Sequence, residues 1–198
     1  HPGNTNEQTT LIPLEEQILR DFSLSKFIVC TDAGLSSERN RKFNNFGGRC
    51  FITTQSIKKL KKDLRQWCLE PTGWHLKDSL DTYDISRLED TAKNRSKLFY
   101  KQLYVEGNDG KRDIDFDQTL IVTYSLKYRN YQQQIRNQQI LRAIKAIDTE
   151  PKRIDKHSQN DYRRFIKKTS ITAYGECAAN KIYEIDQDAV QEEAQNDG

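Results

Sequence analysis

The sequence predicts an α/β protein in which part of a parallel core sheet is joined to an α+β insertion. Two short, β-branched apolar runs, 26–31 and 49–54, flank a short helical pattern, as in a parallel βαβ unit. Two further strand-like runs, 98–105 and 119–124, are joined by a glycine-containing loop and predict an antiparallel hairpin. Helical spacing over 126–147 then predicts one long helix.

The N-terminal part predicts a loop and then a helix. Residues 1–10 are turn formers without apolar periodicity, which is typical of a loop. Pro13 fits the first turn of a helix over 12–22, and Glu15 and Glu16 then lie favourably near its N-terminus.

The βαβ unit explains where Asp32 lies. Ser36 or Ser37 can cap a helix over 37–46, and the glycines at 47 and 48 can end it. The continuous apolar character of 26–31 predicts a strand buried on both faces of a parallel sheet. Asp32 follows this strand directly, so we expect it at the carboxyl edge, where open α/β sheets bind their ligands.

The remaining elements follow from spacing and composition. A helix is predicted over 55–69, and Pro71 to Gly73 closes it. The pattern over 71–97 is weak. In the long helix, Tyr128 and Tyr131 fall on the apolar stripe and are expected to pack, whereas Arg136 is expected in solvent. Residues 148–180 are basic and then irregular, 181–186 form a strand, and a short helix follows.

These elements suggest three parts: 1–70 as part of a core, 71–180 as an insertion, and 181–198 as a segment returning toward the core. The chain is polar, with 31% charged residues and a mean hydropathy of −0.90, and its net charge is +3. No run approaches the roughly 18 apolar residues that would span a membrane, and no signal-peptide core is present. We therefore expect a protein without a membrane partner.

Cysteines and histidines do not predict a zinc site. No CxxC pair occurs among Cys30, Cys50, Cys68 and Cys177, and His1, His75 and His157 lack partners at ligand spacing. Cys30 and Cys50 lie in apolar runs, which indicates buried, reduced thiols and a cytoplasmic protein. The chain begins at His1 and contains no methionine, so we expect a piece of a longer protein.

Three segments carry a family resemblance: PGNTNEQTTLIP at 2–13, FIVCTDAGLSSERN at 27–40 and the run from DFDQTLIVTY to LRAI at 115–144. They resemble the middle of DDE transposases of bacterial insertion sequences. The end of the chain, 183–198, is similar to the stretch before the next core strand. The three main segments occur in the family's order.

This resemblance implies an RNase H-like catalytic core interrupted by a β-rich insertion. In the family, two aspartates and a glutamate hold two Mg²⁺ ions for DNA cleavage and strand transfer. Asp32, followed by Ala33 and Gly34, matches the second aspartate. The other two acids are expected before His1 and after Gly198, so we expect this chain alone to be inactive. The implied partners are double-stranded DNA, at transposon ends and target, and further copies of the protein.

Two interpretations of Asp32 remain open from the residues themselves. Aspartate is a metal ligand of the hard-oxygen type that Mg²⁺ requires. It is also common as a turn or cap residue, because its side chain accepts hydrogen bonds from nearby backbone N–H groups.

Two basic clusters are candidates for DNA contact: Lys58, Lys59, Lys61, Lys62 and Arg65, and Arg163, Arg164, Lys167 and Lys168. Each could instead be a solvated helix face. The alternative function for the chain is therefore a DNA-binding or protein-interaction module without chemistry of its own, in which Asp32 is a cap.

Overall fold

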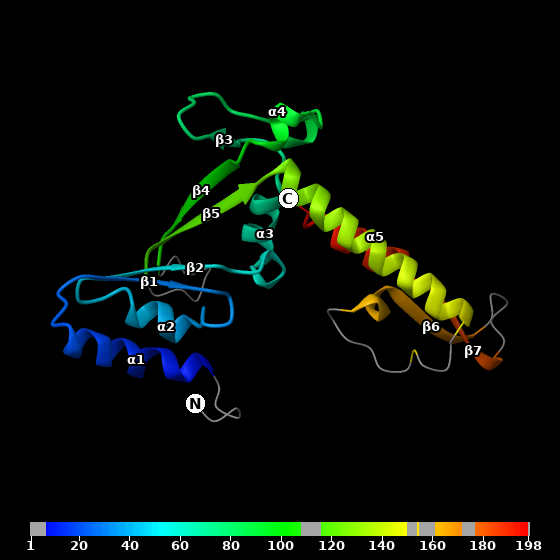
Figure 1. Cartoon of the computed structure of the whole chain (residues 1–198), viewed down its shortest axis with the longest axis horizontal. Helices are drawn as coiled ribbons and strands as arrows, with labels where there is room; N and C mark the ends of the chain where they lie inside the picture. The colour runs from blue at the N-terminus through cyan, green and yellow to red at the C-terminus, as the bar shows by residue number, and fades with distance from the viewer. Residues whose placement is uncertain (1–6, 108–115, 150–153, 155–160, 172–176, 198) are drawn as a thin grey trace. The chain divides into compact units, whose positions relative to one another are not determined.

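The computed structural model describes residues 7–107, 116–149, 154, 161–171 and 177–197. These residues form a mixed α/β structure with six α-helices and seven strands (Figure 1). The chain divides into two compact units, one of residues 1–68 with 102–122 and the other of 69–101 with 123–198. The first boundary lies near the predicted one at 70. Residues 102–122, which form the outer part of the hairpin, belong to the first unit. Residues 181–198 belong to the second unit.

The predicted βαβ arrangement is confirmed in the first unit. Strands β1 (Phe27–Thr31) and β2 (Arg49–Thr53) pair in parallel, with Thr31 opposite Thr53, and helix α2 (Glu38–Phe43) lies between them in the chain. Ser37 caps α2, because its Oγ accepts the Asn40 N–H at 3.3 Å. The glycines at 47 and 48 take positive φ angles of 64° and 76°, which side chains with a Cβ rarely adopt.

The prediction that this strand is buried on both faces is wrong. Val29 is buried, but Ile28 and Ile52 are 64% and 65% exposed, and Cys30 and Cys50 are exposed as well. The described sheet has two strands, and α1 and α2 lie on the same side of it (Figure 1). Alternate side chains point to opposite faces, so the uncovered face carries every second residue.

Helix α1 (Glu7–Asp21) begins earlier than predicted, and Pro13 lies inside it. The loop predicted for 1–10 is therefore wrong from residue 7 onward. Asn40 of α2 donates its side-chain amide to the Gln8 carbonyl at 3.1 Å, which holds the turn that precedes Pro13. This bond attaches the first turn of α1 to α2.

The helix predicted over 55–69 is two shorter pieces. A 3-10 turn, η1 (Ile57–Lys59), ends at Leu60, whose backbone is extended, and α3 (Lys62–Leu69) follows. Repulsion among closely spaced lysines disfavours a continuous helix here. Leu64 and Cys68 are buried on α3.

The predicted hairpin is present. Strands β4 (Phe99–Val105) and β5 (Gln118–Tyr124) are neighbours, and β3 (His75–Leu76) adds to β4. Figure 1 shows β4 and β5 running in opposite directions. Most of the connecting loop, 108–115, lies outside the described residues. Asp117 orders the described ends of that loop, because it accepts the Tyr104 hydroxyl at 2.6 Å and the Gly107 N–H at 2.9 Å.

In the second unit, Trp74, Phe99 and Tyr124 form an aromatic cluster near the hairpin base. The ring centroid of Tyr124 lies 5.8 Å from that of Trp74 and 6.5 Å from that of Phe99. The 3-10 turn η2 (Ile85–Arg87) and the short helix α4 (Ala92–Arg95) follow β3. Asp90, before α4, accepts hydrogen bonds from Arg95 at 2.6 Å and from Asn130 at 2.9 Å. Helix α5 is thereby tied to this segment.

The long helix is confirmed as α5 (Leu126–Thr149). It packs on η4 (Tyr162–Phe165) and on a two-stranded antiparallel sheet of β6 (Ile166–Ile171) and β7 (Cys177–Ile185). A core of Ala143, Ile154, Phe165 and Ile166 lies between these elements. Residues 148–180 are thus not simply irregular as predicted, because β6 and the start of β7 lie within them. The predicted C-terminal helix is α6 (Gln187–Ala194).

Two predictions about α5 side chains are wrong. Arg136 is buried rather than solvated, and its Nη1 lies 2.6 Å from Oδ1 of Asp197. Tyr128 and Tyr131 are 52% and 57% exposed rather than packed. The buried face of α5 is therefore rotated away from the apolar stripe that the sequence suggested. Within the described ranges, no helix has both the length and the apolar character that crossing a membrane requires.

Candidate functional site at the strand ends

Asp32 lies where the sequence predicted, immediately after β1 at the carboxyl end of the parallel pair. Its side chain is exposed, and Oδ1 accepts the Gly34 N–H at 2.9 Å. Its Oδ2 makes no hydrogen bond within the described part of the chain. One carboxylate oxygen is thus fixed by the turn while the other faces solvent.

The backbone of Asp32 is held by the neighbouring strand. The Thr31 hydroxyl donates to Thr53 Oγ1 at 3.0 Å, and the Thr53 hydroxyl lies 3.3 Å from the Asp32 carbonyl oxygen. The Leu35 N–H also donates to that carbonyl at 3.3 Å. These contacts fix the backbone of Asp32 at the end of β1.

Gly34 is restricted by the carboxylate itself. A Cβ at this position would lie 3.1 Å from Asp32 Oδ1, closer than most Cβ contacts. The sequence Asp-Ala-Gly therefore has a local explanation: the glycine lets its N–H approach the carboxylate without a side chain in the way. This hydrogen bond is also what a turn-capping aspartate makes, so the geometry is compatible with both interpretations of Asp32.

Arg41 of α2 contacts the hairpin within the first unit. Its Nη1 donates to Gln118 Oε1 of β5 at 3.0 Å, and its guanidinium lies 5.9 Å from the Phe116 ring. Burial lowers the pKa of Arg41, and the nearby Glu38 carboxylate partly opposes this. The arginine thus links α2 to the hairpin.

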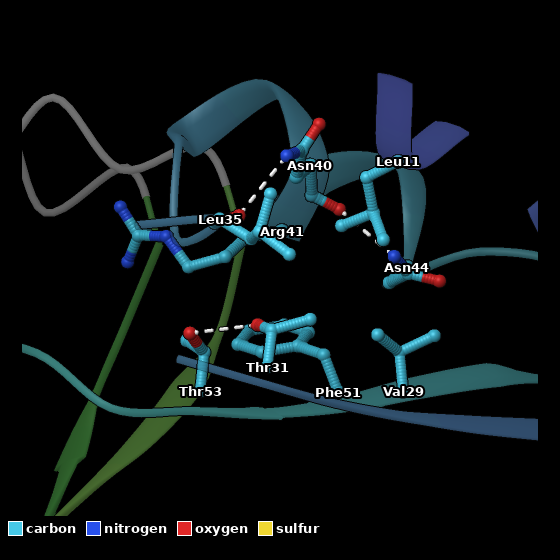
Figure 2. Close-up of a pocket in the computed structure, with 9 residues that line it drawn as sticks. All are labelled: Leu11, Val29, Thr31, Leu35, Asn40, Arg41, Asn44, Phe51 and Thr53. Carbon is cyan, nitrogen blue, oxygen red and sulfur yellow. Dashed lines mark hydrogen bonds between the residues drawn. The ribbon is translucent and has the colours of Figure 1, made fainter. Parts of the chain in front are cut away.

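A small pocket lies between the two helices and the covered face of the sheet (Figure 2). Val29, Thr31, Phe51 and Thr53 of the strands line it from one side, and side chains of α1, α2 and the preceding loop line it from the other. Its cavity volume is about 10 Å³, which is room for about one water molecule. Typical small-molecule sites are about 300 to 1,000 Å³. We interpret this pocket as a packing gap, and Asp32 does not line it.

The donor set at the strand ends fits one ligand of a magnesium site. An exposed carboxylate with an oxygen facing solvent is the hard donor that Mg²⁺ prefers. However, the residues whose placement is described contain no group of three or more His, Cys, Asp or Glu side chains that could hold a metal ion. Asp32 would therefore need further ligands.

The basic residues of the first cluster do not share one helix face. Lys58 and Lys59 lie in η1, Lys61 precedes α3, and Lys62 begins it. All four are exposed, and Arg65 is half-buried. Their charges gather at the N-terminal end of α3, where the helix dipole also favours an anion.

The residues of the second basic cluster lie in two different elements. Arg163 and Arg164 lie in η4 and are half-buried, and Arg164 Nη2 lies 3.3 Å from Glu193 Oε1 of α6. Lys167 and Lys168 are exposed on β6. The two lysines are therefore better placed for a phosphate than the two arginines.

The remaining candidate residues do not form a site. Cys30 and Cys50 were expected to be buried and are exposed, while His75 is half-buried with its ring 6.2 Å from the Tyr100 ring. His1 and His157 lie outside the described residues.

Sequence reasoning missed a buried polar cluster between α1 and α2. Glu15 and Asn44 are 2% and 1% exposed, and Asn44 Nδ2 donates to Glu15 Oε2 at 2.9 Å. Burial raises the pKa of Glu15, and the hydrogen bond from Asn44 and the charge of Arg49 only partly oppose it. A glutamate in an otherwise ordinary helix turn gives no sequence signal of burial.

Comparison with known proteins gives no family assignment: no family model, curated protein or solved structure matches the chain.

Proposed function

We propose that the chain is part of a DNA transposase with an RNase H-like core, which cleaves DNA strands and transfers them at the ends of an insertion sequence. The observation that carries the proposal is the position of Asp32. An exposed carboxylate at the carboxyl end of a strand in a parallel βαβ unit is where this chemistry needs an acid. The family resemblance of the surrounding segments supports the same role.

In this proposal, Asp32 is one of the ligands of a Mg²⁺ pair. When bound, the two ions would activate a water or a 3′-hydroxyl and stabilise the leaving oxygen. The Gly34 N–H fixes Oδ1, and Thr53 together with the Leu35 N–H fixes the backbone. The carboxylate therefore needs little reordering to present Oδ2. The other two acids match no position in this chain.

The proposal also assigns DNA contacts to the exposed lysines near α3 and on β6. Lysines that neutralise phosphates give an affinity that falls steeply with salt. Changing Lys59 and Lys62 to glutamate should weaken duplex binding and reduce the salt slope, as measured by gel shift across a salt series. Unchanged binding would remove this cluster from the DNA-binding surface.

The metal role can be tested with the chain itself by using Mn²⁺ as a probe. Paramagnetic Mn²⁺ should broaden the amide NMR signals of residues 32–35 at millimolar concentrations, and Asp32→Asn should abolish the effect. Asp21→Asn, which changes an exposed acid at the end of α1, is the matched control and should leave it unchanged. Equal broadening in wild type and Asp32→Asn would refute the ligand role. Robust Mg²⁺-dependent nicking by this chain alone would contradict the need for further acids.

The alternative is a DNA-binding or protein-interaction module without chemistry. The hydrogen bond from Gly34 to Asp32 favours it, because that bond is sufficient to explain an aspartate at this turn. Asparagine retains the Oδ1 acceptor. Under the alternative, Asp32→Asn therefore changes neither folding nor DNA affinity, and Mn²⁺ has no preferred position near residue 32.

A further inference from the structure

The outward face of α5 combines aromatic, amide and cationic side chains. At intervals of three or four residues, exposed side chains follow one another along the helix: Lys127, Tyr131, Gln134, Gln138, Arg142 and Lys145. Tyr128 and Ile135 flank them. Lys127 and Lys145 are separated by about 27 Å along the helix axis, at 1.5 Å per residue. The described face is therefore long enough for several nucleotides.

Packing within the second unit does not account for the two tyrosines. The buried side of α5 is occupied by Ala143, with Ile140 and Ile147 against the same core. Tyr128 and Tyr131 are 52% and 57% exposed, and their ring centroids lie 6.2 Å apart with an angle of 32° between the rings. Neither hydroxyl has a hydrogen-bond partner within the described ranges. Two neighbouring rings are thus presented to solvent.

The charge of this face is complementary to a polyanion. Lys127, Arg142 and Lys145 are exposed and form no ion pair with any residue that the structure describes. The acidic residue of α5 is Asp148, in its last turn. A strand of DNA laid along the helix would meet cations near both ends and tyrosines close to one of them.

We propose that this face of α5 binds single-stranded DNA, with Tyr128 and Tyr131 stacking on unpaired bases and Lys127, Arg142 and Lys145 contacting phosphates. Aromatic rings together with cations along an open surface are the usual means of binding unpaired strands. In an intact duplex the bases stack on one another, so these rings would have no base face to contact. The choice of DNA over RNA rests on the proposed function, in which strand ends are opened and joined.

A second protein helix fits this face less well. Docking of two helices requires apolar side chains at successive core positions. After Tyr128, Tyr131 and Ile135, the same positions are Gln138 and Arg142. Leu141 and Ile144 are also exposed, but at about 100° per residue they are turned away from the line of Tyr128, Tyr131 and Ile135. The exposed apolar side chains therefore do not form one continuous stripe, whereas the cationic face continues.

The test is fluorescence anisotropy of a labelled 15-nucleotide oligothymidylate with the whole 198-residue chain, in EDTA and low salt. Changing both Tyr128 and Tyr131 to serine should weaken binding about tenfold or more, since base stacking on an aromatic side chain has an effect of this order. Changing both to phenylalanine should retain binding, because stacking does not need the hydroxyl. Leu80→Ser, at a fully exposed apolar position in the same unit, is the control for loss of surface apolarity.

Three results would overturn the proposal: wild-type affinity in the double serine variant, equal losses for the oligonucleotide and a blunt duplex, or tighter binding of the matching RNA. Self-association of the wild-type chain that is lost in the serine variant, without any effect on DNA, would instead identify a protein contact. Because this assay is run in EDTA, its result does not depend on metal binding at Asp32. Failure of the metal role and failure of this binding face are therefore separate outcomes.

Discussion

Removal of Asp197 should destabilise the second unit strongly. Its Oδ1 lies 2.6 Å from Arg136 Nη1, and the two side chains are only 7% and 10% exposed. Asp197→Ala leaves the arginine charge buried without its partner, which typically costs about 3–5 kcal/mol of the free energy of unfolding.

Urea unfolding, followed by the fluorescence of buried Trp74, measures the stability of the second unit. Trp67 belongs to the first unit, so it is replaced by phenylalanine in every variant. With a slope of about 1–3 kcal/mol per molar urea, Asp197→Ala should lower the midpoint by at least about 1 M. Asp188→Ala, an exposed acid on α6, should leave it unchanged. A loss below about 1 kcal/mol for Asp197→Ala would show a solvated pair and refute the reasoning.

Two further predictions concern buried and paired acids. Because burial raises the pKa of Glu15 above 4.5, the folded state holds this proton more tightly than the unfolded state, so stability falls as pH rises from about 4.5 through the folded-state pKa. Glu15→Gln should remove that decline and be more stable at pH 7 in urea unfolding; a less stable variant would contradict it. The hydrogen bond from Arg95, followed by that from Asn130, lowers the pKa of Asp90 to about 2, so its contribution is present above about 3.8 and lost as pH falls toward 2. In a carboxyl NMR titration, Arg95→Gln should return this pKa toward 3.8, and an unchanged value would show that Arg95 is not the cause.

Local patterns were sufficient to predict the βαβ unit, the hairpin and the long helix. Short β-branched runs, a capping serine and paired glycines act over a few residues, and each specifies its element without help from the rest of the chain. The place of Asp32 at a strand end followed from the same information. The three-stranded hairpin sheet was anticipated only in part, since β3 has two residues and no apolar pattern of its own.

Failures arose where long-range contacts decide the outcome. Arg136 is buried because a carboxylate 61 positions later reaches it, and no window around residue 136 contains that information. Likewise, the first turn of α1 is attached to α2 through the bond from Asn40 to Gln8, 32 positions apart, which no local pattern around Pro13 contains. The exposure of Tyr128 and Tyr131 depends on which side of α5 meets η4 and β7, and helical periodicity alone does not determine it.

The uncovered face of the β1–β2 sheet carries two thiols that can be labelled chemically. Cys30 and Cys50 are exposed on that face, each opposite an isoleucine of the other strand, whereas Cys68 is 2% exposed. A maleimide should therefore modify the first two thiols rapidly and reach Cys68 only when α3 opens locally. Whatever covers this surface, whether another segment or another molecule, would slow labelling at residues 30 and 50 and leave the rate at residue 68 unchanged.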